Sequence, residues 1–478
     1  MNHPANPEDV KLRKRLEGLK VSNRLKVAVV GAGITGLSAA WLLGRENGRA
    51  FDVTLFEADD RLGGHANTVD VAAPDGVCPI DTGFIVYNTA SYPNLIALFD
   101  HLDVPTAETD MGFSVSLGDG RYEYAGSGLA ALIGQPRNLL SVGHWRLMRD
   151  LFRFFREASG PGAVGVDPQM TLGDWLQVRG YSKRFIHAHI VPMGAAIWST
   201  PADEMLAFPF AAFARFFGNH GLLQTFDRPP WRTVRGGSRE YVSRITSAFR
   251  GKIVKGDPVV AVTGSPRGVT ITTRGSGPLQ FDAALMACHA DDALGIVSGI
   301  DGASRAVLGR FRYAQNRAVL HTDATHMPRG RRLWSSWNYI GNSSERDGAE
   351  GSQRISVTYW MNKLQPLPTK TNYFVTLNPA RPIDPRAIVQ SFDYAHPMFD
   401  SAALDAQVKL PSLQGRNLLW FAGSYFGYGF HEDGVQAGLA AAEHLSARLG
   451  APVTRPWSWD VRQSRIAPFA DARAEVPA

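Results

Sequence analysis

Cysteine is scarce in this chain. Only 2 of its 478 residues are cysteines, Cys78 and Cys288, and they lie far apart in apolar or strand-like surroundings. Two isolated cysteines exclude a disulfide framework and a thiolate metal site, and their scarcity fits a reducing compartment. We therefore expect a cytoplasmic protein that uses no metal ion.

Long apolar runs are also missing from the sequence. The most apolar segment, LAFPFAAFARFFG from Leu206, is interrupted by Pro209 and Arg215, whereas a membrane-spanning helix needs about 18 apolar residues. The N-terminus is polar and basic with no hydrophobic segment after it, so no secretory signal is expected. The net charge is +6, but the arginines are dispersed as on a solvated surface. No nucleic-acid partner is therefore expected.

Glycine, by contrast, is abundant, and the segment VAVVGAGITG arranges three glycines as GxGxxG. A β-branched run precedes them and a helix-forming segment follows, which is the strand, turn and helix of a dinucleotide site. Gly31 permits the tight turn, Gly33 lets the backbone approach a pyrophosphate, and Gly36 lets helix and strand pack closely. Ile34 and Thr35 place free N–H groups at the start of the helix, where they can bind phosphate. The pattern predicts a dinucleotide cofactor.

A second strand, FDVTLFE, ends at Glu57, 21 residues after Gly36. An acidic residue at this spacing can accept hydrogen bonds from ribose hydroxyls, and Ala58 lies next to it. The following segment, ADDRLGGHANTVD, contains a further glycine turn with Arg61, Gly63 and Gly64. Here the chain resembles the flavin-containing amine oxidase and phytoene desaturase superfamily, whose signature at this point is RxGG.

The resemblance implies FAD as the cofactor, because an enzyme that uses only NAD has no need of a second phosphate-binding turn. Where the superfamily often has arginine, this chain has His65. That histidine is interpreted as a hydrogen-bonding or packing residue, with a covalent histidyl link to the flavin as the alternative.

Three further segments resemble the superfamily. IDTGFIVYN resembles its turn beneath the flavin and includes Gly83, and RGGSREYVSRI resembles its second GG segment. Short strands are expected between residues 253 and 288, with Val259 at the cofactor. The segment LLWFAGSYFGYGFHEDGVQAGLAAAEHL resembles the final strand, turn and helix of the superfamily. The cofactor contacts that it implies are Gly423, Asp433, Gly434 and Val435, the last three at a helix N-terminus facing the flavin.

The fold class is therefore predicted to be α/β, with a Rossmann-type FAD-binding domain interleaved with an α+β substrate domain, as in amine oxidases. The FAD-binding domain is expected in segments 1–90, 230–300 and 415–450. The substrate domain is expected in segments 91–229 and 301–414, followed by a C-terminal tail at 451–478.

Two segments of the substrate half allow two interpretations each. His144 to Ala158 places four arginines on one helical stripe with apolar residues opposite, which indicates either a core-facing helix with a solvated basic face or an interfacial helix on anionic lipid. Met205 to Leu223 is rich in phenylalanine and leucine, as is the wall of an apolar tunnel or a plain core.

The segments GGHANTV, TYWMN and GYGFHEDG resemble a bacterial subgroup, the methyl-fatty-acid desaturases of furan fatty acid formation. The position of a cage tyrosine in amine oxidases falls on Phe430, so a small polar amine is disfavoured. The resemblance implies hydride transfer from a fatty acyl chain, held in a membrane phospholipid, to flavin N5. The expected partners are an apolar acyl-lipid substrate and, peripherally, an anionic membrane surface.

For the catalytic base we predict His431 or Glu432, with Tyr425 and Tyr428 shaping the face of the flavin. A structural role in the glycine-rich turn is the alternative for each. Three other functions stay open: redox-neutral isomerisation of a double bond, amine oxidation, and a flavin-stabilised scaffold at a membrane surface.

Overall fold

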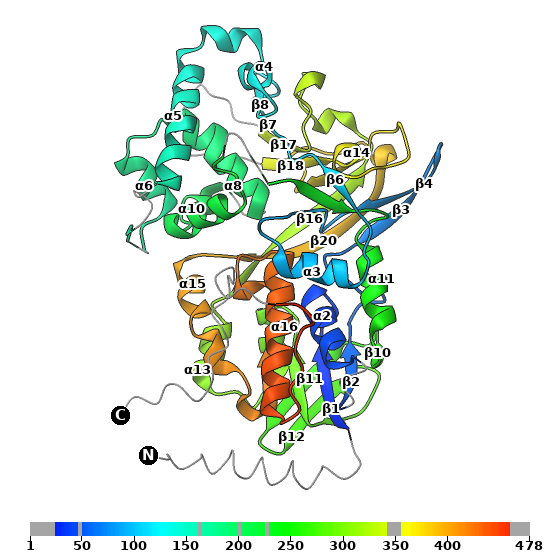
Figure 1. Cartoon of the computed structure of the whole chain (residues 1–478). Helices are drawn as coiled ribbons and strands as arrows, with labels where there is room; N and C mark the ends of the chain where they lie inside the picture. Colours follow the sequence, from blue (N-terminus) through cyan, green and yellow to red (C-terminus); the bar gives the residue numbers. More distant parts are fainter. Residues whose placement is uncertain are drawn as a thin grey trace.

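The protein is described by a computed structural model that covers residues 24–45, 50–160, 165–167, 169–198, 202–224, 229–341 and 355–458. It has two lobes, one above the other in Figure 1. The lower lobe holds the parallel sheet, and the upper lobe holds the larger mixed sheet and most helices. Within these ranges, no helix is long and apolar enough to cross a membrane. The basic N-terminal residues lie outside the described residues.

A five-stranded parallel sheet organises the lower lobe, in the order β10, β2, β1, β14, β21. Its strands are β1 (Leu25–Val30), β2 (Phe51–Phe56), β10 (Lys252–Val254), β14 (Ala283–Met286) and β21 (Leu419–Phe421). β1 is almost uniformly apolar because both faces of a parallel sheet are covered. Since all strands run in one direction, the turns after β1, β2, β14 and β21 meet at the same edge.

Two helices from opposite ends of the chain cover one face of this sheet. They are α2 (Ile34–Leu43) and α16 (His431–Arg448), which lie side by side in Figure 1. A Cβ on Gly438 would lie 2.3 Å from the carbonyl oxygen of Thr35, so glycine is required where the two helices touch. Helix α11 (Arg239–Ala248) packs against α2.

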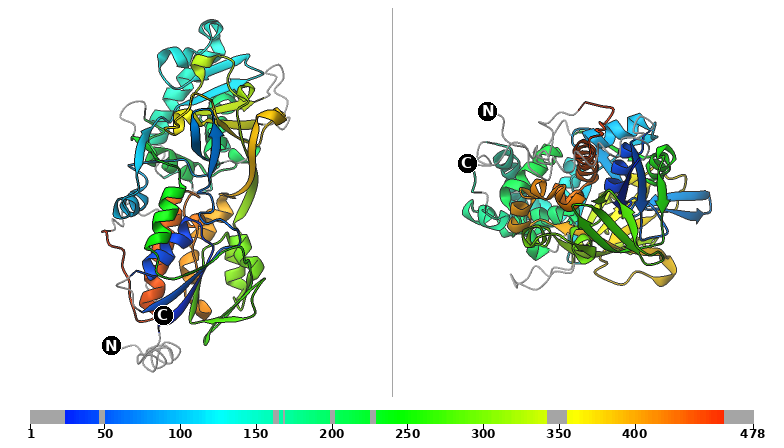
Figure 2. Two further views of the ribbon diagram at one scale, coloured as in Figure 1. Left: turned by 90° about the vertical axis from the view of Figure 1, so that its right-hand side faces the viewer. Right: turned by 90° about the horizontal axis from the view of Figure 1, so that it is seen from below.

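A smaller sheet closes the lower lobe, with strand order β13, β12, β11, β15. Its strands are β11 (Val259–Ser265), β12 (Gly268–Thr273), β13 (Leu279–Phe281) and β15 (Val297–Ser298). In the chain, α12 (Ala290–Ile296) immediately precedes β15, and α13 (Gly302–Leu308) follows it. The prediction of short strands between residues 253 and 288 is confirmed. Figure 2 shows this sheet beside the parallel one.

The upper lobe is built on a seven-stranded mixed sheet, in the order β20, β16, β19, β18, β17, β7, β8. Its strands are β7 (Phe113–Leu117), β8 (Tyr122–Ala125), β16 (Arg312–His321), β17 (Trp337–Gly341), β18 (Ile355–Trp360), β19 (Phe374–Leu377) and β20 (Ile388–Met398). The long pair β16 and β20 lies over the boundary between the lobes (Figure 1). The remaining strands form two ribbons, β3 (Thr68–Ala73) with β4 (Gly76–Asp81), and β5 (Val86–Asn88) with β9 (Trp231–Val234) and β6 (Thr106–Thr109).

The other helices belong mainly to the upper lobe and to the boundary between the lobes. Those of residues 93–219 are α3 (Pro93–His101), α4 (Leu129–Ile133), η1 (Pro136–Leu140), α5 (Val142–Ser159), α6 (Leu172–Val178), α7 (Lys183–Phe185), the π-helix η3 (Ile186–Ile190), α8 (Val191–Trp198), α9 (Ala202–Met205) and α10 (Phe210–Asn219). Those of later residues are η4 (Ala324–His326), η5 (Arg331–Leu333), α14 (Met361–Leu364), η6 (Pro385–Ala387), α15 (Ser401–Gln407), η7 (Leu410–Leu413), η8 (Arg416–Leu418) and η9 (Ser424–Phe426). The predicted fold class, a Rossmann-type sheet combined with α+β elements, is confirmed.

Helix α5 is a core-facing helix. Leu147, Leu151 and Phe154 are buried in the core of the upper lobe, so this apolar face cannot enter a membrane. The interpretation of α5 as an interfacial helix inserted through its apolar face is wrong. In the segment from Met205 to Leu223 both interpretations hold for different residues, because Phe213 lies in the core whereas Phe216 lines a cavity.

Candidate active site

Two glycine-rich turns meet at the carboxyl edge of the parallel sheet. Gly31 follows β1 at φ +102°, and a Cβ there would lie 2.8 Å from the carbonyl oxygen of Ala287. Gly63 donates its N–H to the carbonyl oxygen of Ala32 over 2.9 Å. Gly33 and Gly63 also form a parallel β-bridge. The turns that the sequence presents separately are thus one continuous surface.

Open space lies next to Gly33. A Cβ on Gly33 would have no protein atom within 4 Å, whereas a Cβ on Gly36 would lie 1.8 Å from the carbonyl oxygen of Gly31. Gly36 therefore allows α2 to pack against the turn. Gly33 instead faces the cavity just before Ile34 and Thr35, which begin α2. A phosphate in that space would meet the free N–H groups of the helix N-terminus.

Polar side chains surround the two turns. The carboxylate of Glu57 accepts the N–H of Ala32 over 2.8 Å and that of Asp59 over 3.0 Å. Arg61 donates one N–H to a backbone carbonyl over 3.0 Å. Glu57, Ala58 and Arg61 line the cavity. The carboxylate and the guanidinium both retain capacity for further hydrogen bonds, because a carboxylate has four lone-pair sites and a guanidinium five N–H groups.

The second glycine turn is held against the segment that follows β4. The N–H of Phe84 donates to the carbonyl oxygen of His65 over 2.7 Å, and a Cβ on Gly83 would lie 2.2 Å from that oxygen. The buried Asp81 accepts hydrogen bonds from both the N–H and the hydroxyl of Ser238, at 2.9 and 2.7 Å. Gly64 lies within 3.2 Å of the first turn, measured from a Cβ placed on it. Residues 63–65 and 82–84 therefore form one wall of the cavity, and Asp81 connects this wall to the start of α11.

His65 lies among aromatic rings and other histidines. Its ring centroid is 5.0 Å from that of Tyr394 and 5.1 Å from that of His396. Nε2 of His65 is buried and has no hydrogen-bond partner among the described residues. Burial, and the neighbouring His396, lower the pKa of His65 well below its usual value, so the ring is neutral. A neutral histidine with one unused nitrogen at a cofactor cavity fits a hydrogen bond to the ligand.

The turn after β21 brings the C-terminal residues to the same cavity. Gly423, Tyr425 and Tyr428 line it. A Cβ on Gly423 would lie 2.3 Å from the ring of Tyr425. The Tyr425 side chain is buried, and its hydroxyl has no hydrogen-bond partner among the described residues. Val259, at the start of β11, contributes to the wall on the side of the smaller sheet.

His431 is the first residue of α16 and faces the cavity. Its ring is stacked on that of Phe84, with centroids 3.7 Å apart and an interplanar angle of 16°. The Tyr241 hydroxyl lies 3.0 Å from Nε2 of His431. Burial lowers the pKa of His431 to about 3, so the imidazole is neutral but is a weaker base than an ordinary histidine. His431 stays a candidate base because of its position at the cavity and its contacts with Phe84 and Tyr241.

Glu432 serves a different purpose from the one predicted. Its side chain is buried and accepts three hydrogen bonds, from the N–H and the side-chain amide of Asn94 and from the N–H of Leu95. These N–H groups belong to the first turn of α3, so the carboxylate caps that helix. Glu432 is not among the described residues that line the cavity. The structure does not support Glu432 as the base, and its structural role is to cap α3 and not to hold the glycine-rich turn, which was the alternative.

Replacing Glu432 by glutamine should therefore lower stability and spare the cavity. We expect Glu432→Gln to reduce the free energy of unfolding by about 1–3 kcal/mol, because the amide leaves donors of α3 unsatisfied. Thermal unfolding measures the change, and the ratio of flavin to protein should stay constant. The exposed Glu108 supplies a matched control, Glu108→Gln, with little effect. Loss of turnover at unchanged stability would contradict the capping role.

Asp433, Gly434 and Val435 place the start of α16 and do not reach the cavity. The carboxylate of Asp433 accepts the N–H groups of Tyr428 and Phe430, at 3.0 and 2.9 Å, and so caps its own helix. Gly434 packs on the start of α2, and Val435 is buried. Among the described residues, α16 lines the cavity through His431 alone. Contact of the cofactor with the N–H groups at this helix N-terminus, as the sequence predicts for these three residues, stays a prediction.

The cavity is large, with a volume of about 1360 Å³. One end is formed by the glycine turns, and the other extends between the helices and the sheet of the upper lobe. The upper part is lined mainly by apolar and aromatic side chains, including Met111, Phe113, Leu132, Phe155, Met193, Ile197, Trp198, Phe216, Leu222 and Trp337. Such a chamber is large enough for a dinucleotide together with an elongated apolar substrate.

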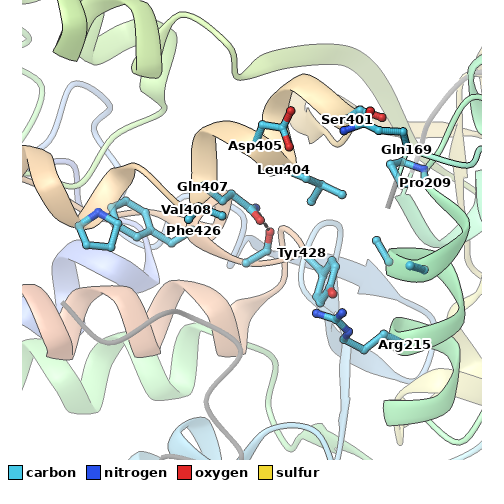
Figure 3. A pocket seen from close by; sticks show the side chains of 14 residues that line it. Gln169, Pro209, Arg215, Ser401, Leu404, Asp405, Gln407, Val408, Phe426 and Tyr428 are labelled. Carbon is cyan, nitrogen blue, oxygen red and sulfur yellow. Dashed lines mark hydrogen bonds between the residues drawn. The ribbon is translucent and has the colours of Figure 1, made fainter. Parts of the chain in front are cut away.

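A second, smaller cavity of about 300 Å³ lies between α10, α15 and the turn before α16 (Figure 3). Gln407 lines this cavity, and its side-chain amide N–H groups donate to the carbonyl oxygens of Tyr425 and Gly427. Tyr428 lines both cavities and stands between them. Gln407 therefore fixes the turn that presents Tyr425 and Tyr428 to the larger cavity.

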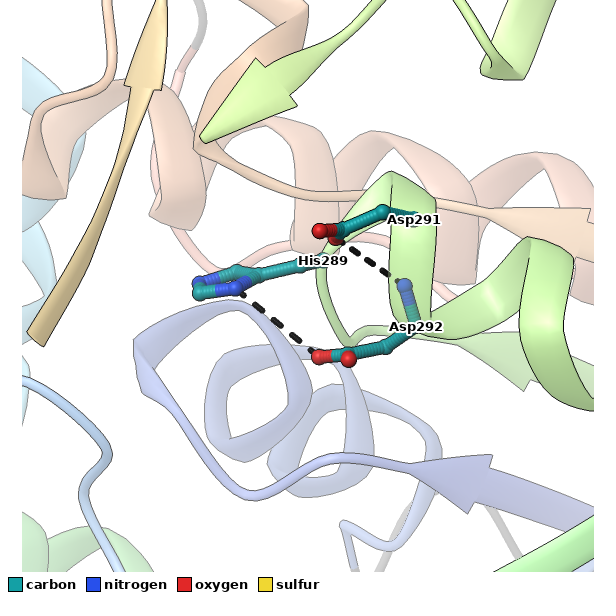
Figure 4. Close-up of side chains that lie close together, drawn as sticks. All are labelled: His289, Asp291 and Asp292. Atoms are coloured by element: carbon teal, nitrogen blue, oxygen red, sulfur yellow. Dashed lines mark hydrogen bonds and ion pairs between the residues drawn. The ribbon is translucent and has the colours of Figure 1, made fainter. Parts of the chain in front are cut away.

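One group of side chains has the composition of a metal site. His289, Asp291 and Asp292 have potential ligand atoms within 4.8 Å of one another, at the start of α12 (Figure 4). Both aspartates are exposed and lie in the first turn of α12, where carboxylates are favoured by the helix dipole. His289 stacks on Tyr313, with ring centroids 4.4 Å apart, and lines the larger cavity. Each residue thus has a local structural reason for its position.

Comparison with known proteins identifies the family. The sequence model of the family described as flavin containing amine oxidoreductase matches residues 34–307, which is more than half of the chain. The chain belongs to this family. Its members use FAD, so FAD is the cofactor of the protein and oxidoreduction its class of chemistry. The predictions of FAD and of a flavin enzyme are thereby confirmed.

Individual relatives are similar to this chain either over a short segment or at low sequence identity. An L-amino-acid oxidase of Bungarus fasciatus is 55% identical over 49 residues, which are 10% of this chain and 9% of that protein. An L-amino acid dehydrogenase of Synechocystis is 25% identical over 271 residues, 54% of this chain and 55% of that protein. The chain thus spans about a tenth and about half of these relatives.

Solved structures share the whole fold. A cyclohexylamine oxidase from Brevibacterium oxydans superimposes with a TM-score of 0.63 at 17% identity, over 90% of this chain and 100% of that chain. A CLA-producing fatty acid isomerase from P. acnes gives a TM-score of 0.61 at 14% identity, over 90% and 99%. A candidate protoporphyrinogen oxidase from Exiguobacterium gives 0.64 at 14% identity, over 90% and 99%. At such identities the similarity establishes the fold.

The residues at the lower end of the cavity fit FAD. Gly33 offers the open space that a pyrophosphate needs, and Glu57 stands at the end of β2, where the ribose of a dinucleotide binds in this fold. Arg61 supplies a positive charge beside the joined turns, and the unused nitrogen of His65 supplies a further hydrogen-bonding group. These residues come from three segments of the chain but border one cavity.

Several residues of the cavity were not found in the sequence. Phe84, Tyr241, Tyr394 and His396 surround His65 and His431, and Tyr124 hydrogen-bonds His189 in the upper part. His189 belongs to a π-helix, an element that is frequent at functional sites. Phe84 and Tyr241 lie inside the segments IDTGFIVYN and RGGSREYVSRI, but their partner His431 is far away in the chain, so neither segment indicates the contact.

The buried histidines predict an acid-sensitive protein. Burial lowers the pKa of His396 to about 4 and that of His431 to about 3, from an ordinary value of 6.5. Below pH 6.5 the unfolded chain takes up protons that the folded protein does not, so stability falls as the pH falls. Each histidine contributes a slope of about 1.4 kcal/mol per pH unit. Urea unfolding between pH 6.5 and 5 should show a smaller slope in His396→Gln, and an unchanged slope would refute this origin.

Proposed function

We propose that the protein dehydrogenates a fatty acyl chain, and that its substrate is a methyl-branched unsaturated acyl group of a membrane phospholipid. The observation that carries the proposal is the upper part of the cavity, which is long and apolar. Among the described residues, no lysine, arginine or acidic side chain lines this cavity from α4, α5, α8 or α10. Such a wall suits a hydrocarbon chain, which gains free energy by leaving water.

An amino acid is a poorer fit to this cavity. Its carboxylate would need a cation near the reacting carbon, and the one arginine among the described lining residues is Arg61, beside the glycine turns. A neutral amine would need a polar aromatic cage. At the cage position Phe430 is stacked on Phe216, with centroids 4.8 Å apart.

Dehydrogenation removes a hydride and a proton from neighbouring carbons. FAD, when bound, supplies the hydride acceptor. His431 is proposed to take the proton, because its imidazole is neutral, faces the cavity and is held by Phe84 and Tyr241. Tyr241 keeps its own proton, since burial raises the pKa of its hydroxyl well above the usual value, and so acts by positioning the imidazole. Turnover also requires a terminal two-electron acceptor, and molecular oxygen is the first to test.

A second candidate function is redox-neutral isomerisation of an acyl double bond. The similarity of fold to a fatty acid isomerase favours it, and the same apolar cavity would serve. The two functions differ in whether electrons leave the substrate. Consumption of oxygen or of another acceptor in proportion to product indicates dehydrogenation, and product without consumption indicates isomerisation.

The decisive experiment is anaerobic reduction of the flavin. Purified holoprotein is mixed with phospholipids that carry methyl-branched unsaturated chains, and the visible flavin band near about 450 nm is followed. Bleaching by these lipids, and not by amines or amino acids, is the expected result. Bleaching by amines or amino acids alone would overturn the proposal in favour of an amine or amino-acid oxidase. Product analysis by mass then distinguishes a new double bond from a moved one.

A further inference from the structure

Exposed apolar side chains gather at one end of the upper lobe. Of the 13 large apolar side chains that are exposed in the described residues, six lie between residues 129 and 152. We call this group the mouth patch, and its members are Leu129, Leu139, Leu140, Val142, Trp145 and Phe152. Leu140, Leu129 and Val142 are 91%, 83% and 81% exposed, the three highest values among the 13.

The mouth patch is continuous in space. Its residues lie on α4, on η1 and on the outer face of α5, which are consecutive and in contact at the end of the molecule far from the parallel sheet (Figure 1). The indole N–H of Trp145 donates to the carbonyl oxygen of Leu139 over 2.9 Å and so joins α5 to η1. Val142, Trp145 and Phe152 share the helix face opposite to the one buried in the core.

The large cavity opens within the mouth patch. Leu129 and Phe152 line the cavity and are also exposed, by 83% and 49%. Leu132 and Phe155, each three residues further along the same helix, also line the cavity. One cavity therefore extends from the surface patch to the glycine turns, and its walls next to the patch are apolar.

The chain segment that carries most of the mouth patch contains charges of one sign. Residues 124–149 contain no aspartate or glutamate. Arg137, Arg146 and Arg149 are exposed in this stretch. The next acidic residue, Asp150, is buried, and its carboxylate accepts hydrogen bonds from the Arg149 side chain and from the N–H of Ser182. This stretch is therefore apolar and basic, and the exposed Asp119 precedes Gly120, whose carbonyl oxygen accepts a hydrogen bond from Arg137.

We propose that the mouth patch docks on an anionic phospholipid bilayer, so that an acyl chain enters the cavity directly from the lipid. Exposed leucine, valine and tryptophan side chains insert at the level of the headgroups, and arginines bind anionic phosphates around them. The identity of what enters the cavity rests on the proposed function, but the docking does not. This contact differs from insertion of the buried face of α5.

Vesicle sedimentation tests the docking without turnover. The full-length holoprotein is mixed with vesicles of phosphatidylcholine, with or without phosphatidylglycerol. We expect binding to the anionic vesicles, weakened at least about 10-fold by high salt or by the double variants Leu140→Ser/Val142→Ser and Arg137→Ser/Arg146→Ser. The control is Val77→Ser/Val408→Ser, at exposed valines outside the patch, and it should bind as the native protein does.

A second measurement separates this proposal from the proposed function. Flavin reduction is compared for one acyl lipid in detergent micelles and in anionic vesicles. The Leu140→Ser/Val142→Ser variant should keep its rate with micelles and lose it with vesicles. Native protein that is reduced by micellar lipid but does not sediment with vesicles would overturn the docking alone. Vesicle binding by the mouth patch with no reduction by any acyl lipid would overturn the function alone.

Discussion

Gly33→Val should prevent the protein from retaining FAD without unfolding it. The backbone at Gly33 has φ −70° and ψ −178°, which any residue adopts, and a Cβ there meets no protein atom within 4 Å. The added side chain would occupy the space that a pyrophosphate needs before the N-terminus of α2. We expect FAD affinity to fall by at least about 100-fold, or about 3 kcal/mol, because charge-assisted hydrogen bonds to phosphate are lost. Flavin absorbance after gel filtration measures the loss.

A pair of alanine variants separates binding from folding. Gly33→Ala should lower flavin content at an unchanged unfolding temperature of the apoprotein. Gly36→Ala should lower the unfolding temperature as well, because its Cβ would lie 1.8 Å from the carbonyl oxygen of Gly31. Gly218→Ala, on the exposed side of α10 with no atom within 4 Å, is the neutral control. Full flavin content in Gly33→Val would contradict the position assigned to the phosphates.

His431→Phe should abolish most of the turnover while the cofactor stays bound. Phenylalanine preserves the ring stacked 3.7 Å from Phe84 but removes both nitrogens of the proposed base. General base catalysis contributes about 10²–10⁴-fold, so kcat should fall by about that factor. Steady-state kinetics with the acyl lipid identified by flavin reduction measures the effect. The flavin spectrum and the unfolding temperature serve as checks on the integrity of the variant.

Tyr241→Phe tests the positioning of the His431 imidazole separately from its role as a base. It removes the hydroxyl that lies 3.0 Å from Nε2 of His431 but leaves the imidazole in place. We expect a smaller loss of kcat, by about 10-fold, which corresponds to one hydrogen bond. Equal losses in the two variants, or full activity of His431→Phe, would exclude His431 as the base.

Prediction from the sequence was most successful where function depends on neighbouring residues. The segment from Gly31 to Gly36 and the turn at Gly63 have fixed spacings, because a phosphate-binding turn is a local backbone structure. The prediction failed at Glu432, which differs from His431 by a single position. On a helix, adjacent residues point about 100° apart, so the packing of α16 against α3 decides which of the two faces the cavity.

The sequence by itself determined the cofactor class, the Rossmann-type sheet and the two glycine turns, since each follows from short motifs whose geometry is local. Only the tertiary structure decided that these turns form one surface through Gly33 and Gly63, and that His431 lies against Phe84 and Tyr241. It also decided that the cavity opens at Leu129 and Phe152. The physical reason is that burial and contact depend on how distant segments pack, and no local spacing specifies that packing.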